Sequence, residues 1–346
     1  MNKIIPTFFI FVAALWILVI MSINPLTHET SERELKKNVH NIVHMLLKER
    51  QKRFVADPFI GVDVVRVWNT FNINRKVSCD VNCEFTTSTD HIDAYVHELR
   101  GRQPPRDTNK VTIYFQFEGE HYYPIDTRGW TVEASYRWSA PILIPYFMYR
   151  QHTDFTVANT PVPFDAINGV SFLARNCNSK NKREDVIKGL IKAGIRIDSM
   201  SSCLHNAEKP TGNDDKIRIM KLYKFHAAFE NGNVKDYVTE KVYLALKAGT
   251  IPIYFGAPNI DLFVPKGSIV NVDSFGSLEA LSSHIKECMN NETLYNSYHE
   301  WRKKPLDENF VKRFNFTHKS HECTICRWLY ARRHKYKWIH NLQHFK

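Results

Sequence analysis

The residues best suited to chemistry lie between positions 223 and 256, where a strand-like stretch leads through a polar loop into a helix. Tyr223–Phe229 is the strand-like part, and Thr239 is a suitable N-cap for the helix that follows. A helix N-terminus offers free N–H groups and partial positive charge, both of which favour phosphate. Lys241 falls in the first helical turn, where its ammonium adds to that field. The segment therefore predicts a nucleotide-sugar site at the carboxyl end of a strand.

Glu240 suits a different part of the same ligand. A carboxylate beside a pyrophosphate would repel it, whereas the same group readily accepts hydrogen bonds from sugar hydroxyls. We therefore expect Glu240 to contact a ribose. Gly249 fits the end of the helix and Pro252 the beginning of the next strand, so part of the segment has a purely structural explanation.

The surrounding pattern predicts the elements that position this segment. Short apolar runs between turn-rich connections indicate strands of a first α/β domain at residues 64–68, 111–115 and 141–145. A β–α–β rhythm follows, with strands expected at 170–174, 195–198, 223–229, 251–255 and 269–272 and helices at 183–192, 239–247 and 278–289. We expect two mainly parallel sheets covered by helices, with a domain boundary near residues 161–168.

The N-terminal region carries a membrane signal. Ile4–Ile23 contains no charged side chain, and its length matches the roughly 20 helical residues that cross the hydrocarbon core of a bilayer. Lys3 precedes this run and acidic residues follow it, so the positive-inside bias places the short tail in the cytosol and the remainder in the lumen. A cleaved signal peptide is the alternative, but its apolar region should span only about 7–15 residues. Mixed charges and helical apolar spacing then predict a stem at residues 29–53.

Lumenal exposure agrees with two further features. Asn291 and Asn315 each begin a glycosylation triplet. The chain has 7 cysteines, which favour disulfides in an oxidising compartment. The pair Cys79 and Cys83 near one end mirrors the pair Cys323 and Cys326 near the other, and we expect these two pairs to cross-link.

Two cysteine alternatives remain open. Four thiolates at Cys79, Cys83, Cys323 and Cys326 would also suit tetrahedral zinc, although oxidation in the secretory pathway disfavours keeping them reduced. Cys177 and Cys203 form a second plausible bridge, which leaves Cys288 unpaired.

The net charge of +11 is compatible with nucleic acid, an anionic membrane or an anionic small molecule as partner. The predicted lumenal topology argues against nucleic acid. The basic stretch 327–346 contains no Asp or Glu, and it is most simply interpreted as a solvated terminal segment.

Several motifs together resemble one known family. YKF-x3-FEN at 223–231, DYVTEK at 236–241 and AG-x-I-P-I-x2-G at 248–256 look like the signature of the inverting α1,3/α1,4-fucosyltransferases. Weaker similarity extends over roughly residues 64–326. The resemblance implies GDP-fucose as donor substrate and a GT-B fold, in which two Rossmann-like α/β domains flank a cleft.

The same resemblance assigns roles to individual residues. Tyr237, Glu240 and Lys241 would bind GDP, while Arg183 at the start of its helix would meet the diphosphate; Lys182 is the alternative by one position of register. Glu230 and Asn231, at a strand's carboxyl end, would contact the donor. Cationic side chains can stabilise the negative charge of the leaving GDP.

An inverting transfer also needs a base that removes the proton of the acceptor hydroxyl. The predicted strand at 111–115 leads into Glu118-Gly119-Glu120-His121, which resembles the family's Glu-Ser-Pro or Glu-Ser-Ala loop and departs from it at Gly119-Glu120. Strand register favours Glu118 as the base, with Glu120 as the alternative, and a lone histidine such as His121 is more often a surface or hydrogen-bonding residue. Because the chain has no Asp-x-Asp pair, we expect no obligatory catalytic metal or other cofactor.

The sequence thus predicts a single-pass type II Golgi membrane enzyme with a lumenal catalytic part. Its parts would be a cytosolic tail (1–3), an anchor (4–23), a stem (24–60), an acceptor-binding domain (61–165), a GDP-fucose-binding domain (166–326) and a basic tail (327–346). The expected reaction is transfer of fucose from GDP-fucose to a GlcNAc hydroxyl of a glycan acceptor on glycoproteins or glycolipids, with α1,3 linkage favoured. Protein O-fucosylation and a catalytically inactive glycan-binding protein are the alternatives.

Overall fold

The structure, a computed structural model, describes residues 64–98, 109–146, 160–210, 215–307, 310, 320–336, 338–339 and 344–345. The predicted anchor at 4–23 and stem at 24–60 lie outside these residues. Within the described ranges, none of the helices combines the length and apolar character that crossing a bilayer requires.

The first domain is built on a 7-stranded sheet with the order β2-β3-β1-β4-β5-β6-β7. All neighbouring strands are parallel except β2 and β3. The strands are β1 (Val65–Asn69), β2 (Arg75–Lys76), β3 (Cys83–Thr86), β4 (Ala94–Glu98), β5 (Val111–Gln116), β6 (Val132–Ser135) and β7 (Ile142–Leu143). The three strands expected from the sequence correspond to β1, β5 and β7, and the buried runs explain why they were recognisable.

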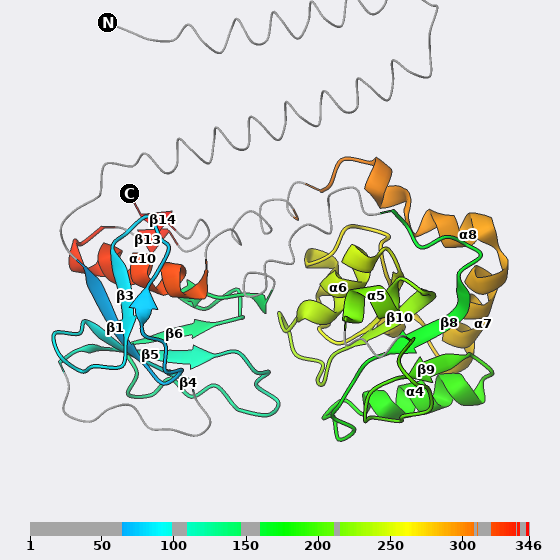
Figure 1. Cartoon of the computed structure of the whole chain (residues 1–346), viewed down its shortest axis with the longest axis horizontal. Coiled ribbons are helices and arrows are strands. Elements are labelled where there is room, and N and C mark those ends of the chain that lie inside the picture. Colours follow the sequence, from blue (N-terminus) through cyan, green and yellow to red (C-terminus); the bar gives the residue numbers. More distant parts are fainter. Residues whose placement is uncertain are drawn as a thin grey trace, which may run out of the picture. The chain divides into compact units, whose positions relative to one another are not determined.

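The second domain contains a wholly parallel 5-stranded sheet with the order β12-β11-β10-β8-β9 (Figure 1). Its strands are β8 (Ile167–Phe172), β9 (Ile197–Ser199), β10 (Tyr223–Phe229), β11 (Ile251–Phe255) and β12 (Val270–Asn271). Every residue of β10 is buried, as expected for the central strand of a sheet covered on both faces. Both sheets are therefore mainly parallel, as the sequence predicts.

Helices alternate with these strands along the second domain. The α-helices are α4 (Arg183–Lys192), α5 (Lys216–Met220), α6 (Glu240–Ala248), α7 (Leu278–Asn290) and α8 (Glu292–Ser297), and the 3-10 helices are η3 (Ile260–Leu262), η4 (Val272–Ser274) and η5 (Glu300–Lys303). Helix α4 has the predicted bounds, while α6 and α7 each differ from prediction by one residue. Apolar side chains of α4 and α7 pack with the sheet in one continuous core.

Gly249 ends α6 in the left-handed conformation, with φ of 82°. A Cβ at this position would also overlap the carbonyl oxygen of Thr160. Only glycine meets both conditions without strain, so the predicted helix end is confirmed and its close approach to the preceding segment is explained.

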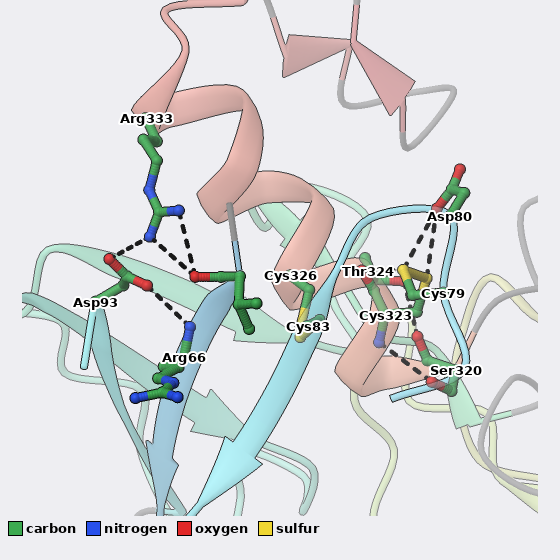
Figure 2. Close-up of a disulfide and its surroundings, with 11 residues drawn as sticks. Arg66, Cys79, Asp80, Cys83, Asp93, Ser320, Cys323, Thr324, Cys326 and Arg333 are labelled. Atoms are coloured by element: carbon green, nitrogen blue, oxygen red, sulfur yellow. Dashed lines mark hydrogen bonds and ion pairs between the residues drawn. A yellow bond between two sulfur atoms is a disulfide. The ribbon is translucent and has the colours of Figure 1, made fainter. Parts of the chain in front are cut away.

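The end of the chain returns to the first domain. Helix α10 (His321–Arg333) lies against the first sheet, and Cys83–Cys326 and Cys79–Cys323 are disulfides that fasten it there (Figure 2). Leu329 and Tyr330 are buried with apolar residues of that sheet. The two predicted cysteine pairs do cross-link, and the zinc alternative is excluded because the four sulfurs are bonded to one another.

Helix α10 also corrects the interpretation of the basic tail. Arg327 is only 8% exposed and lies 3.5 Å from a carboxylate oxygen of Asp80. Arg333 pairs with Asp93 (Figure 2) and reaches the carbonyl of Val64. Residues 327–333 are thus part of a packed helix rather than a solvated segment, because the apolar side chains between their charges cover the first sheet. Two short antiparallel strands follow, β13 (Trp338–Ile339) and β14 (His344–Phe345).

Candidate functional site

A cluster of charged and hydroxyl groups forms where β10 ends and α6 begins. Glu230 follows β10 directly and is completely buried. Its carboxylate accepts hydrogen bonds from the backbone N–H of Thr239 at 2.8 Å and from the Thr239 hydroxyl at 2.8 Å. Lys241 donates to Oε2 of Glu230 at 3.0 Å and to the Thr239 hydroxyl at 2.7 Å. Glu230 therefore holds the N-terminal turn of α6 against the end of β10.

This arrangement gives Glu230 a structural role that the sequence did not show. The side chain has no exposed surface and both of its oxygens accept hydrogen bonds within the protein, while its direct contact with the donor stays a prediction. Its position is internal because the helix N-terminus needs an acceptor there. Thr239 is the N-cap residue, as predicted, but its hydroxyl bonds to Glu230 and makes no side-chain cap.

Lys241 and Glu240 lie at the surface of the same turn. The Lys241 side chain is 28% exposed, and Glu240 is half-buried. Burial lowers the pKa of Lys241, but the carboxylates of Glu230 and Glu240 outweigh it and the pKa is raised. Lys241 is thus a permanent cation at a helix N-terminus, which is the combination that binds phosphate.

Arg183 begins α4 and is buried. Its guanidinium donates to the carbonyl of Phe229 at 2.8 Å and to that of Asn176 at 2.9 Å. Burial lowers its pKa, although Glu230 and Glu184 act in the opposite direction. Arg183 therefore joins the loop after β8 to the end of β10, close to the position at which a diphosphate contact is predicted.

The loops after β8 and β10 are held together by further hydrogen bonds. Asn181 donates to the carbonyl of Glu230 at 3.1 Å and to Oδ1 of Asn233 at 2.7 Å. The N–H of Lys180 donates to the carbonyl of Asn231 at 3.0 Å. Asn231 itself is half-buried beside these contacts. The predicted donor residues from both loops thus gather at one edge of the sheet, where parallel strands end.

Tyr237 connects this edge to the candidate base. Its hydroxyl donates to Oε2 of Glu118 at 3.1 Å. The ring is 2% exposed and lies among other aromatic side chains, with ring centroids 5.1 Å from Tyr136, 5.7 Å from Tyr146 and 5.6 Å from His121. Burial raises the pKa of Tyr237 well above the ordinary value, and Tyr146, Glu230 and Glu118 add to the effect. The phenol therefore stays neutral and donates a hydrogen bond to the Glu118 carboxylate.

Glu120, the alternative base, points elsewhere. Its carboxylate lies 3.6 Å from the guanidinium of Arg137, which makes a closer two-point ion pair with Glu133, at 2.6 and 3.0 Å. Glu118 is consequently the loop carboxylate that faces Tyr237. A carboxylate hydrogen-bonded to Tyr237 can accept a proton from a hydroxyl nucleophile, while a cation such as Lys241 can stabilise a departing diphosphate.

A cavity of about 510 Å³ opens beside the carboxyl ends of β8 and β9, and none of its lining residues was singled out from the sequence. The disulfide Cys177–Cys203 ties together the two loops that form it. The lining is mainly polar and comprises Arg175, Met200, Ser201, Ser202, His205, Glu208 and Lys209. This disulfide confirms the third predicted pairing, and Cys288 is free and buried as expected.

The structure also bears on the metal and glycosylation predictions. In the parts of the chain that the structure describes, the only grouping with metal-ligand geometry is Cys79, Asp80 and Cys323, and its two sulfurs form a disulfide. Asn291 is exposed and caps α8 by accepting from the N–H of Leu294, so its amide nitrogen faces away from the cap. Asn315 lies outside the described residues.

Three residues at the site were given no role by sequence reasoning. Tyr136 and Tyr146 complete the aromatic surroundings of Tyr237, and Asp236 accepts from the N–H of Trp138 at 3.1 Å. Asp236 has φ of 67° and also accepts from the side chain of Asn259 at 2.8 Å. Such long-range partners leave no local spacing signal; only the position of Tyr146 after β7, at a sheet edge, could have suggested a role.

Comparison with known proteins places this geometry in a family. The model of glycosyltransferase family 10 (fucosyltransferase), C-terminal part, matches residues 167–345, about half of the chain. The chain belongs to this fucosyltransferase family. The match contains β8 to β12, Arg183, Glu230, Tyr237, Glu240 and Lys241, so the resemblance seen in the sequence motifs is confirmed.

Relatives of this family 10 chain carry several different activities in their names. A fucosyltransferase-like protein of Arabidopsis thaliana is 29% identical over 73% of this chain and 49% of its own length. An alpha-(1,3)-fucosyltransferase of Caenorhabditis elegans is 37% identical over 38% of this chain and 36% of its own. A GDP-fucose protein O-fucosyltransferase 3 of Xenopus laevis is 34% identical over 39% of this chain and 31% of its own. The chain thus spans between 31% and 49% of the length of these three relatives.

The fold is shared with a solved family member. An alpha1,3-fucosyltransferase determined with GDP-fucose superimposes with a TM-score of 0.55 over 73% of this chain and 87% of that one, at 15% identity. The expected α/β organisation of the GT-B type is therefore shown.

Proposed function

We propose that this chain transfers fucose from GDP-fucose to a GlcNAc hydroxyl of glycoprotein glycans, forming an α1,3 linkage with inversion at C1. The observation that carries the proposal is the 3.1 Å hydrogen bond between Tyr237 and Glu118. It brings the candidate base of the first domain next to the donor segment of the second. Membership of the fucosyltransferase family supports fucose as the transferred group.

Each residue then has a defined part in the reaction. Glu118 accepts the proton of the acceptor hydroxyl as its oxygen attacks C1 of fucose, opposite the departing GDP. Lys241 and the N-terminus of α6 stabilise the negative charge that develops on the diphosphate. Glu230 keeps Lys241 in place, at 3.0 Å. Glu240 accepts hydrogen bonds from the ribose, and Asn231 contacts the donor.

The cavity beside β8 and β9 is where we place the guanine ring. Adjacent parallel strands lie about 4.8 Å apart, so the end of β9 is roughly 10 Å from the end of β10, a distance that a nucleoside diphosphate spans. Glu208 lines the cavity and can accept from the two neighbouring N–H groups at one edge of guanine. Arg175 can donate to the oxygen and nitrogen acceptors on the ring's other edge.

A membrane anchor and a Golgi location belong to the same proposal. The uncharged run Ile4–Ile23 supports a signal-anchor, and the disulfides Cys79–Cys323, Cys83–Cys326 and Cys177–Cys203 agree with an oxidising lumen. Fusing the first 60 residues to a fluorescent reporter tests this directly. Co-localisation with Golgi membranes and extraction only by detergent are the expected results, and a freely soluble cytosolic reporter contradicts them.

Protein O-fucosylation is the second candidate, because a relative with 34% identity is named a protein O-fucosyltransferase. A relative named an alpha-(1,3)-fucosyltransferase and a relative named a protein O-fucosyltransferase match similar shares of this chain, 38% and 39%. The choice between them therefore depends on residues of the first domain, which contribute the acceptor side of the site.

One experiment distinguishes transfer to glycans, transfer to protein side chains and binding without transfer. The full chain is incubated with several nucleotide sugars and with a panel of N-glycans, Lewis-type precursors and folded peptide modules, and the products are sequenced by mass spectrometry. Fucosylated GlcNAc supports the leading proposal, whereas fucose on Ser or Thr supports the second. GDP binding without transfer to any acceptor would indicate a glycan-binding protein without activity.

A further inference from the structure

His121 occupies a slot between two glycines that belong to different domains. A Cβ built on Gly119 would overlap the imidazole, and so would a Cβ built on Gly232. Gly119 directly follows Glu118 in the loop after β5, and Gly232 directly follows Asn231 in the loop after β10. One ring therefore touches both the loop that carries the candidate base and the loop that carries donor residues.

The ring is flanked by aromatic side chains in the other directions. Its centroid lies 4.6 Å from that of Tyr122 and 5.6 Å from that of Tyr237. Tyr122 in turn donates from its hydroxyl to the carbonyl of Asn178 at 3.1 Å, which joins the loop after β5 to the loop after β8 as well. His121 is thus enclosed by the two glycines and by the rings of Tyr122 and Tyr237, and it contributes to holding these groups in place.

The imidazole contributes its shape here rather than a charge. Burial lowers the pKa of His121, although the Asn231 side chain, Glu118 and Glu120 act in the opposite direction. A neutral ring packs between two Cα atoms without the cost of burying a charge. Neither glycine has a positive φ, so what each one supplies is space and not an unusual backbone conformation.

The departure of this loop from the family pattern then has a physical explanation. The Glu-Ser-Pro and Glu-Ser-Ala loops of the family carry Ser after the glutamate, whereas this chain carries Gly119. A Cβ at that position would take the volume that the imidazole of His121 fills. Glycine at 119 and histidine at 121 are therefore a matched pair, completed by Gly232 on the opposite side.

We propose that His121 is a positioning residue that fixes Glu118 against Tyr237 by wedging between Gly119 and Gly232. The inference rests on the proposed transferase function. It adds to that function the residues that hold the loop carrying Glu118 within hydrogen-bond distance of Tyr237. Filling the slot displaces the ring, and a misplacement of about 1 Å in such a site lowers the rate by about 10²-fold.

The test is a double-mutant cycle in the full chain, with Gly232→Ala, His121→Ala and the double variant. Gly232→Ala is expected to lower kcat by about 10²-fold while the affinity for GDP, measured without acceptor, is unchanged. In the His121→Ala background the added methyl group meets no ring, so Gly232→Ala is expected to cause no further loss. Gly276→Ala is the matched control, because a Cβ at Gly276 has nothing within 4 Å.

Two results would overturn the proposal. One is a Gly232→Ala variant as active as Gly276→Ala, and the other is an equal loss from Gly232→Ala with and without His121. The pH dependence of kcat separates positioning from proton transfer. If His121 only positions Glu118, His121→Ala lowers kcat at all pH values. If His121→Ala instead removes the rise or the fall of kcat on one side of the pH optimum, His121 acts as an acid or base. If the unmodified chain transfers no fucose, the same cycle read by thermal unfolding still reports the contact, so failure of the function and failure of the wedge are distinguishable.

Discussion

The hydroxyl oxygen of Tyr237 lies 3.1 Å from Oε2 of Glu118. Two sequence motifs separated by more than a hundred residues thus meet through a single hydrogen bond. Because Tyr237 is buried and its pKa is raised, it donates to the carboxylate and fixes its orientation. The base of the proposed transfer is in this way positioned by the domain that carries the predicted donor residues.

Replacing Glu118 with Gln tests the base assignment. The amide keeps the size of the side chain but cannot accept a proton, so we expect kcat to fall by about 10²–10⁴-fold. Affinity for GDP is expected to remain unchanged, as measured by calorimetry.

Glu120→Gln is the matched control for that change, since Glu120 faces Arg137 and not Tyr237. It is expected to keep most of the activity. A fully active Glu118→Gln together with an inactive Glu120→Gln would show that the alternative base is the correct one.

Replacing Glu230 with Gln tests the buried support of the donor site. The change removes the charge that holds Lys241 and weakens the bonds to Thr239, so we expect the free energy of unfolding to fall by about 1–3 kcal/mol. GDP affinity should fall as well, because Lys241 loses its anchor. Chemical denaturation and calorimetry measure the two effects; an unchanged stability would contradict the described burial. Glu287→Gln, in α7, is a suitable control for a helix carboxylate outside this cluster.

Replacing Glu208 with Gln tests the placement of guanine in the cavity. The two oxygens of the Glu208 carboxylate can accept from both N–H groups of one guanine edge. The amide of Gln has one accepting oxygen, and its NH2 group is a donor that cannot pair with the second N–H. We expect GDP affinity to fall by about tenfold and the preference for GDP over inosine diphosphate to narrow. Equal losses for the two nucleotides would place the base elsewhere.

Removal of divalent cations tests the prediction that no metal is obligatory. Lys241 and the N-terminus of α6 supply positive charge beside the proposed diphosphate position, so fucose transfer should persist in EDTA. A strict loss of transfer, restored by manganese, would contradict this expectation.

Stability is predicted to decline in mild acid. Burial lowers the pKa of His226 to about 3 and that of His321 to about 4, so the folded protein favours the neutral rings. The corresponding stabilisation is complete above the ordinary histidine pKa of about 6.5 and is lost as the pH falls toward 4. Chemical denaturation between pH 7 and 4 should show that the free energy of unfolding falls as the pH is lowered. His321→Gln should reduce this fall, whereas the exposed His205→Gln should not.

The sequence was most informative where the chemistry and the local pattern coincide. Helix α4, strand β10 and the end of α6 at Gly249 could be predicted closely, because buried runs and glycine carry local signals. The cysteine pairs were predictable from their mirrored spacing. The burial of Glu230 could not be predicted because it depends on Thr239 and Lys241, nine and eleven residues further along.

Other features could not be read from the chain because they depend on distant partners. The contact of His121 with Gly232 and the cavity beside β8 and β9 arise only when separate loops meet. The basic C-terminal stretch was misinterpreted for the same reason. Its charges dominate the local pattern, whereas the apolar side chains of Leu329 and Tyr330 gain a partner only from the first sheet.

The return of α10 to the first sheet has a consequence for the order in which the protein is made. The first domain needs Ile325, Leu329 and Tyr330 to complete its apolar core, and these residues emerge from the ribosome only after the whole second domain from β8 to η5. The second domain is continuous in sequence from β8 to η5, so it can fold while the chain is still being extended. Strands β1 to β7 all end at or before Leu143, whereas α10 begins at His321, so they stay uncovered while the second domain is made; this makes them the part of the nascent protein most dependent on chaperones.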